Sequence, residues 1–293
     1  MRQSDQSMGV VLALLSALGY GISDVFGGLA SRRISPVRVA LIGQVAGLCA
    51  AAVALLVVAA ASPAGADLVW GACSGVGTGL AMVFLFRGLS RGAMSVVVPV
   101  SAVGGVALPV LVTAAFLGER PPALAWVGVL LALPALWFIS GGSDRSGTVQ
   151  RAAVYDGLGA SGGIALQYLC LAQADASAGL WPILTGRAAA VAAVLVAAVT
   201  FMRHRGPRAT ATSPVAARPF TFSVAAGVLA AAALAAYLYA LRTEFVTVTV
   251  VLASLYPVVP VIVGLAFLGE RLRTSQVAGL AGALAAAILI VVA

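Results

Sequence analysis

Two ionisable residues, Asp24 and Arg187, stand inside long apolar segments of this 293-residue chain. A charge at the centre of a bilayer costs at least about 2.5 kcal/mol, so such a residue needs a partner or a function. Counted from opposite ends of their segments, Asp24 lies about 9 Å deep and Arg187 about 13 Å deep in a helix. We therefore expect both to face a cavity, to attract each other when it is empty, and to exchange that partner for a ligand or a proton. The alternative is a fixed structural ion pair, or a protonated Asp24 bonded to the backbone.

Polar and aromatic side chains in the neighbouring apolar segments form a looser set of candidate binding residues. Amphipathic rings with hydroxyl or amide groups nearby can line a passage for molecules that are part apolar and part polar. Ordinary hydrogen bonding between helices is the alternative for each residue. The set consists of Tyr20, Ser23, Gln44, Gln167, Tyr168, Trp181, Ser101, Tyr237, Ser254 and Tyr256.

The composition requires these residues to be positioned by membrane helices. Apolar residues make up 62% of the chain and charged residues only 9%, whereas a soluble domain is typically about 25% charged. An apolar run of about 20 residues crosses the hydrocarbon core as a helix. The sequence predicts ten such spans, at 8–30, 36–61, 67–87, 93–117, 122–140, 152–173, 178–202, 220–242, 246–268 and 274–293.

Charge and cysteine content argue against several other classes of protein. The net charge is +8, but the arginines are dispersed over helix ends and loops, so we expect no nucleic-acid partner. Cys49, Cys73 and Cys170 fall inside apolar spans without the spacing of metal ligands, so we expect neither a disulfide framework nor a metal site. The chain also lacks a phosphate-binding loop for ATP and a catalytic constellation of side chains, so we expect no cofactor and no enzymatic activity.

The pentapeptide FLGER occurs twice, at 116–120 and at 267–271. Without gaps, residues 107–120 match residues 258–271 at nine of fourteen positions, which indicates an internal duplication. Each half then holds five spans, an odd number, so the second half enters the membrane inverted relative to the first. We expect an all-α membrane protein with two inverted repeats, 1–147 and 148–293, around a central cavity.

Residues that bend or close the helices occupy corresponding places in the two halves. We expect Pro99, Pro109, Pro257 and Pro260 to interrupt the fourth and ninth spans and to act as hinges, with simple packing as the alternative. Glu119 and Glu270 each stand next to an arginine at a helix end and are candidates for a gate or a surface cap. Glycines 71, 75 and 79 form a stripe that lets another helix backbone approach the third span closely.

The arrangement of these features resembles the EamA family of the drug/metabolite transporter superfamily. The resemblance rests on two halves of five spans, each with a proline-bearing fourth span that leads into Leu-Gly-Glu-Arg, and on the stretch 20–28, YGISDVFGG. It implies a ten-helix bundle around a cavity and a secondary transporter of metabolites, amino acids or drugs in the cell membrane, usually an exporter. A flippase for a lipid-linked intermediate and a non-transporting membrane assembly or sensor protein are the alternatives.

The sequence leaves orientation and coupling open. Most arginines belong to the side that holds the loops after odd-numbered spans, which the positive-inside rule places in the cytoplasm, with both termini outside. Members of the family are usually drawn with both termini inside. Asp24 is the candidate for proton coupling, with uncoupled facilitation as the alternative, and the internal duplication allows a single chain to work as a monomer.

Overall fold

The computed structural model of the protein describes residues 3–57, 63–116, 120–139, 148–205, 216–243, 252–253 and 255–293. Within these ranges the chain is helical, and none of the described residues forms a β-strand. The helices are α1 (Gln3–Ser31), α2 (Pro36–Val57), α3 (Gly65–Arg91), α4 (Met94–Phe116), α5 (Ala123–Ile139), α6 (Thr148–Leu171), α7 (Trp181–Arg205), α8 (Ala217–Thr243), α10 (Val258–Phe267) and α11 (Thr274–Val292), with a short 3-10 helix, η1 (Ala176–Ala178), before α7.

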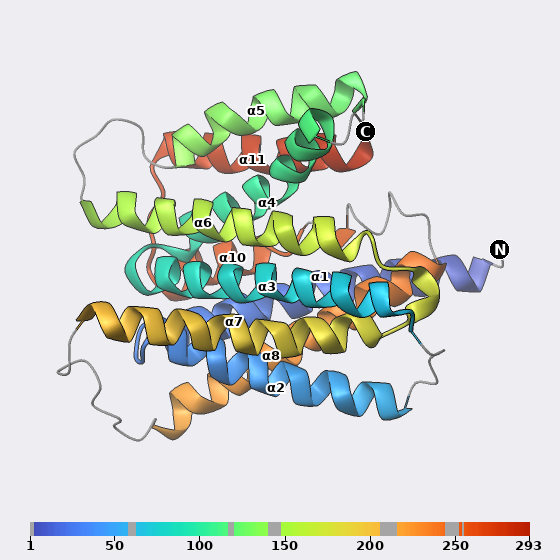
Figure 1. The fold of residues 1–293 in the computed structure, drawn as a ribbon. Helices are drawn as coiled ribbons and strands as arrows, with labels where there is room; N and C mark the ends of the chain where they lie inside the picture. Colours follow the sequence, from blue (N-terminus) through green and yellow to red (C-terminus); the bar gives the residue numbers. More distant parts are fainter. Residues whose placement is uncertain are drawn as a thin grey trace.

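The helices lie side by side in one bundle with two distinct ends (Figure 1). At one end α1 and α3 finish and α4 begins, so this end carries Arg32, Arg91 and Arg271, and we call it the arginine-rich end. At the other end lie both chain termini and the link between α6 and α7 (Figure 1), and we call it the termini end.

Glycines set the closest helix crossings of the bundle. A Cβ atom on Gly75 of α3 would overlap the carbonyl oxygen of Gly186 on α7, and one on Gly227 of α8 would overlap the carbonyl oxygen of Gly43 on α2. The two crossings are therefore built alike, by corresponding helices of the two parts of the chain. The glycine stripe predicted on α3 is confirmed as a packing face, because Gly71 and Gly79 also lie against α7.

The crossing of α5 and α11 repeats the same pattern within a single helix pair. A Cβ on Gly128 would lie 2.9 Å from the carbonyl oxygen of Ala286, and a Cβ on Gly279 would lie 2.8 Å from the carbonyl oxygen of Ala135. Gly128 and Gly279 are equivalent in the register of the FLGER repeat. The duplication read from the sequence thus reappears as paired contacts.

Most predicted spans coincide with helices to within a few residues at each end, but the ninth does not. A continuous helix over 246–268 is wrong, because residues 255–257 form a turn and α10 begins only at Val258. Proline has no backbone N–H to donate, so Pro257 and Pro260 favour the start of a helix over its interior. Seven described helices are long and apolar enough to cross a membrane, and α5 and α10 are shorter apolar helices.

Candidate functional site

The bundle encloses a cavity of about 550 Å³ between α4, α10 and α11 on one side and α1, α6 and α8 on the other. Its walls are mainly apolar, with Val103, Val106, Ile164, Leu284 and Ile290 among the lining residues. The volume falls in the range of about 300 to 1,000 Å³ that is usual for small-molecule sites. These apolar residues were not predicted as cavity residues, because in sequence they resemble residues that face lipid.

The cavity reaches one end of the bundle and stops short of the other. Ala172, directly after α6, and Val291, near the end of α11, both line it, so it extends to the termini end. Toward the arginine-rich end Pro99 is the first residue of α4 in its wall. The preceding side chains of α4, residues 94–98, are at most 1% exposed. The first turn of α4 therefore seals the cavity from the arginine-rich end.

All four predicted tyrosines lie in the cavity wall. Tyr20, Tyr168, Tyr237 and Tyr256 all line it, from α1, α6, α8 and the turn before α10. The rings of Tyr20 and Tyr256 pack in a tilted arrangement with centroids 6.2 Å apart. Their hydroxyl groups give a largely apolar cavity polar groups that can orient a ligand.

Asp24 lies one helical turn after Tyr20 on the same face of α1 and is 5% exposed. It is close enough to Tyr20, Tyr168 and Tyr256 to interact with them electrostatically. Among the described residues, none forms an ion pair or a hydrogen bond with its carboxyl group. Asp24 is thus a buried acid beside the tyrosines of the cavity, without a partner in the described part of the chain.

Neither Asp24 nor Arg187 is among the residues that line the cavity, and the two do not pair, so the expected ion pair is wrong for this conformation. The guanidinium Nη1 of Arg187 donates a hydrogen bond of 3.0 Å to Oε1 of Gln44, and the Arg187 residue is 5% exposed. No ion pair joins the two side chains, although both lie near Tyr20. Depth along the helices placed the two charges at similar levels, but depth does not fix the direction in which side chains point around the bundle.

The remaining polar candidates divide between helix contacts and positions outside the cavity wall. Ser23 donates a 2.8 Å hydrogen bond to the carbonyl oxygen of Ala226, which joins α1 to α8. Ser101 donates one of 2.8 Å to Val98 within α4 and also interacts with the hydroxyl of Tyr256. The structure does not place Gln167 or Trp181 in the wall of the cavity, and Ser254 lies outside the described residues.

The prolines predicted as hinges surround the cavity, although α4 is continuous through both of its own. Pro99, Pro109 and Pro257 line the cavity, and Pro260 is fully buried in the first turn of α10. Because proline cannot donate to the carbonyl four residues earlier, Pro109 leaves the carbonyl of Gly105 without its helical donor. Gly105 also lines the cavity, so its carbonyl adds a hydrogen-bond acceptor to an apolar wall.

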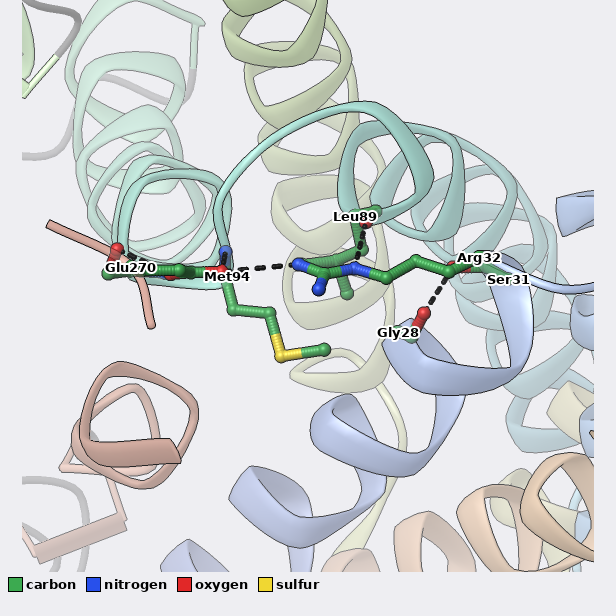
Figure 2. A network of polar contacts seen from close by, with 7 residues as sticks. Gly28, Ser31, Arg32, Leu89, Met94 and Glu270 are labelled. Atoms are coloured by element: carbon green, nitrogen blue, oxygen red, sulfur yellow. Dashed lines mark hydrogen bonds and ion pairs between the residues drawn. The ribbon is translucent and has the colours of Figure 1, made fainter. Parts of the chain in front are cut away.

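Glu270, predicted as a gate or a cap, is the centre of a network at the arginine-rich end (Figure 2). Its carboxylate accepts hydrogen bonds from the backbone N–H groups of Met94 at 2.9 Å and Ser95 at 3.0 Å, and from the Ser95 hydroxyl at 2.7 Å. Arg32, directly after α1, donates to the same carboxylate at 3.1 Å and to the carbonyl of Leu89 at 3.4 Å. The segment between α10 and α11 is thereby fastened to α1 and to the start of α4.

Arg32 and Ser95 were not predicted as parts of this network, because a loop arginine and a serine after a helix break are common at any membrane surface. The backbone N–H groups at the start of a helix have no partner inside the helix and favour negative charge, and a carboxylate supplies it. Glu119, the repeat counterpart of Glu270, lies outside the described residues.

A second buried carboxylate joins helices at the termini end. Asp67 of α3 accepts hydrogen bonds from the backbone N–H groups of Ala64 at 3.1 Å and Asp175 at 2.9 Å. Asp175, in the link between α6 and α7, in turn accepts hydrogen bonds from Ser177, which lower the pKa of its carboxyl. The cavity extends to this end in spite of the contact.

A bundle of apolar helices around a ligand-sized cavity, lined by tyrosines and flanked by two buried charges, defines a multi-pass membrane protein that handles small molecules. The sequence model of the EamA-like transporter family matches residues 7–141 and 159–292. The protein belongs to this family, and it is therefore a membrane transporter of small solutes. Members of the family are in general not enzymes.

Comparison with solved structures supports the fold alone. One, described as "Crystal structure of protein", has a TM-score of 0.58 at 16% sequence identity, and the match covers 97% of this chain and 96% of the other. No curated protein matches the sequence closely enough to indicate a solute. The cavity is therefore the feature that bears on the chemical class of the solute.

Proposed function

We propose that the protein is a secondary transporter that exports small solutes across the cytoplasmic membrane by alternating access. The observation that carries this proposal is the cavity itself, which reaches the termini end and stops at the buried first turn of α4. Alternating access requires a site that is open toward one side of the membrane and sealed from the other. The tyrosines, Asp24 and Arg187 provide polar groups for the solute in or beside this cavity.

The two halves of the mechanism are residues 1–147 and 148–293, related as inverted repeats. The paired glycine crossings support this division, because α3 on α7 and α8 on α2 are built from corresponding helices. When two equivalent halves exchange conformations, a cavity open to one side becomes a cavity open to the other. The contacts of Glu270 with α1 and α4 then belong to the state that is sealed at the arginine-rich end.

The side of the membrane that the cavity faces follows from the arginines. The positive-inside rule places the arginine-rich end in the cytoplasm, so we propose that the cavity of this structure is open to the outside and that both termini lie there. A reporter fused to Ala293 that is active only outside the cytoplasm checks this orientation. Activity only in the cytoplasm would reverse it.

Asp24→Asn is expected to reduce transport at least tenfold without lowering stability. A buried carboxylate with no described partner costs free energy, so its removal leaves the melting temperature unchanged or raises it. Transport falls because the solute or a coupled proton loses the group that receives it. A thermal-shift panel of amino acids, amines, cationic drugs, nucleosides and sugar phosphates identifies a solute, and counterflow of that solute in proteoliposomes measures the loss.

Asp67→Asn is the matched control, because Asp67 is buried to 6% exposure but holds two backbone N–H groups. We expect Asp67→Asn to lower the free energy of unfolding by about 1 to 2 kcal/mol, through weaker hydrogen bonds. Wild-type counterflow in a well-folded Asp24→Asn variant would contradict the role of Asp24. The absence of counterflow for every solute that stabilises the wild-type protein would contradict the proposed transport.

A further inference from the structure

Arg187 is a buried cation whose hydrogen-bonding capacity is mostly unused. The residue is 5% exposed, and Gln44 is the one described residue that accepts a hydrogen bond from it. No carboxylate among the described residues forms an ion pair with its guanidinium. A guanidinium has five N–H donors and stays charged at every physiological pH, so within the described part of the chain one neutral amide acceptor leaves its charge unbalanced.

The surrounding helices hold the guanidinium in a fixed place near the cavity. Gly47 of α2 lies beside it, since a Cβ at this position would be in ordinary contact with Nη1 of Arg187 at 3.5 Å and in close contact with the carbonyl oxygen of Gly227 at 3.0 Å. Tyr20 connects this place to the cavity, because its side chain lines the cavity and packs against the apolar cluster that contains Ile183 of α7, one turn before Arg187. Arg187 also lies in the part of α7 nearer the termini end, the end to which the cavity extends.

We propose that Arg187 binds the anionic group of the solute, and that the solute is a monoanionic carboxylate with an apolar body. This inference rests on the proposed transport function and assigns a solute class to its site. One guanidinium balances one negative charge, and its planar fork matches the two oxygens of a carboxylate. The apolar wall formed by residues such as Val103, Val106 and Leu284 accommodates the rest of the molecule.

The charge distribution around the cavity restricts the solute further. Asp24 forms no ion pair with Arg187, so it does not neutralise the guanidinium directly. A dianion such as a phosphate monoester carries about −1.5 to −2 charges at neutral pH and would exceed the single positive charge.

Binding of three matched probes to the purified full-length protein in detergent tests this proposal. 4-Phenylbutyrate, 4-phenylbutyramide and 4-phenylbutylamine share one apolar body and differ in the charge of the head group. We expect the wild-type protein to bind the carboxylate at least about tenfold more tightly than the amide, as a charge-assisted hydrogen bond implies, and to bind the amine no better than the amide. Calorimetry gives the dissociation constants, and thermal shift confirms them.

Variants then assign the preference to one residue. Arg187→Gln is expected to bind the carboxylate and the amide equally, and Arg187→Lys to retain part of the preference. Arg187→Lys keeps the buried charge but loses the planar fork, so a partial loss of preference in this variant serves if Arg187→Gln does not fold. Arg271→Gln, at an exposed arginine, controls for attraction of anions by the net charge of +8 and is expected to behave as the wild type.

Three results would overturn the assignment. The wild-type protein could bind the carboxylate and the amide equally, or it could fail to bind the carboxylate. The third result is a loss of preference in Arg271→Gln as large as that in Arg187→Gln. Binding of the amide or amine alone would remove the anion site but leave a cavity that binds ligands. Counterflow of the solute identified in the thermal-shift panel would then test the proposed transport function independently of Arg187.

Discussion

Replacement of Gly75 by alanine is expected to lower the free energy of unfolding by about 3 kcal/mol or more and to reduce the yield of folded protein strongly. The added methyl group would overlap the carbonyl oxygen of Gly186, which belongs to a helix backbone and cannot change rotamer. Helices α3 and α7 would have to move apart along their crossing. In a bilayer, where close packing rather than water drives helix association, this separation removes much of what holds the two helices together.

Gly227→Ala is expected to act in the same way at the crossing of α8 and α2, because its methyl group would overlap the carbonyl oxygen of Gly43. The Gly227→Ala substitution is also expected to change solute binding, because this crossing lies near Arg187. Gly227 also lies against Gly47, and Gly47 lies beside the guanidinium of Arg187. Any Gly227→Ala protein that folds should therefore show altered solute binding as well as a lower melting temperature.

Gly162→Ala provides the control, since a Cβ at this position of α6 meets no atom within 4 Å. There the substitution gains helix propensity, worth up to about 1 kcal/mol, without an opposing contact. Unfolding in detergent, followed by circular dichroism against added denaturing surfactant, compares the three variants with the wild type. Equal stability of Gly75→Ala and Gly162→Ala would show that the helices can separate at no cost.

The helices of this protein could be predicted from the sequence because length and apolarity determine a membrane span almost completely. The exception, the start of α10, comes from two prolines in a segment whose apolar run is otherwise continuous. Hydropathy measures the transfer of side chains into lipid and does not register a missing backbone donor. The glycine stripe on α3 was predicted correctly, because spacing alone puts its members on one helix face. Gly186 of α7, which packs against this stripe, was not predicted.

The candidate site was predictable only in its polar part. Four tyrosines of the predicted set share one cavity, since amphipathic rings in a membrane helix have few other places to lie. The partners of Asp24 and Arg187 depend on the rotation of each helix about its own axis, which an almost uniformly apolar segment does not reveal. The contact of Ser23 with α8 could not be predicted either, because a serine is equally suited to a helix contact and to a cavity wall.

Glu270→Gln is expected to shift the protein toward a state that is open at the arginine-rich end. The substitution keeps the shape of the side chain but removes the charge that two backbone N–H groups, a hydroxyl and Arg32 approach. Weakened charge-assisted hydrogen bonds of a carboxylate that is 10% exposed should cost about 2 kcal/mol, or about thirtyfold in the equilibrium between sealed and open states.

Labelling of an introduced cysteine measures this shift. Val96 is fully buried in the sealing turn of α4, so Val96→Cys, in a protein whose Cys49, Cys73 and Cys170 are replaced by serine, should resist a membrane-impermeant maleimide. Adding Glu270→Gln should make it reactive from the arginine-rich end. Asp67→Asn, which weakens the contact at the termini end, should leave Val96→Cys protected.

Arg32→Gln separates the two kinds of contact that Glu270 makes. The Arg32 side chain is 33% exposed, and solvent screens such a pair, so its loss should cost at most about 1 kcal/mol and increase labelling far less. That order, with Glu270→Gln well above Arg32→Gln, would mean that the backbone donors at the start of α4 hold the seal. Equal effects would assign the seal to the ion pair, and unchanged protection in both variants would show that Glu270 caps the helix without closing the cavity.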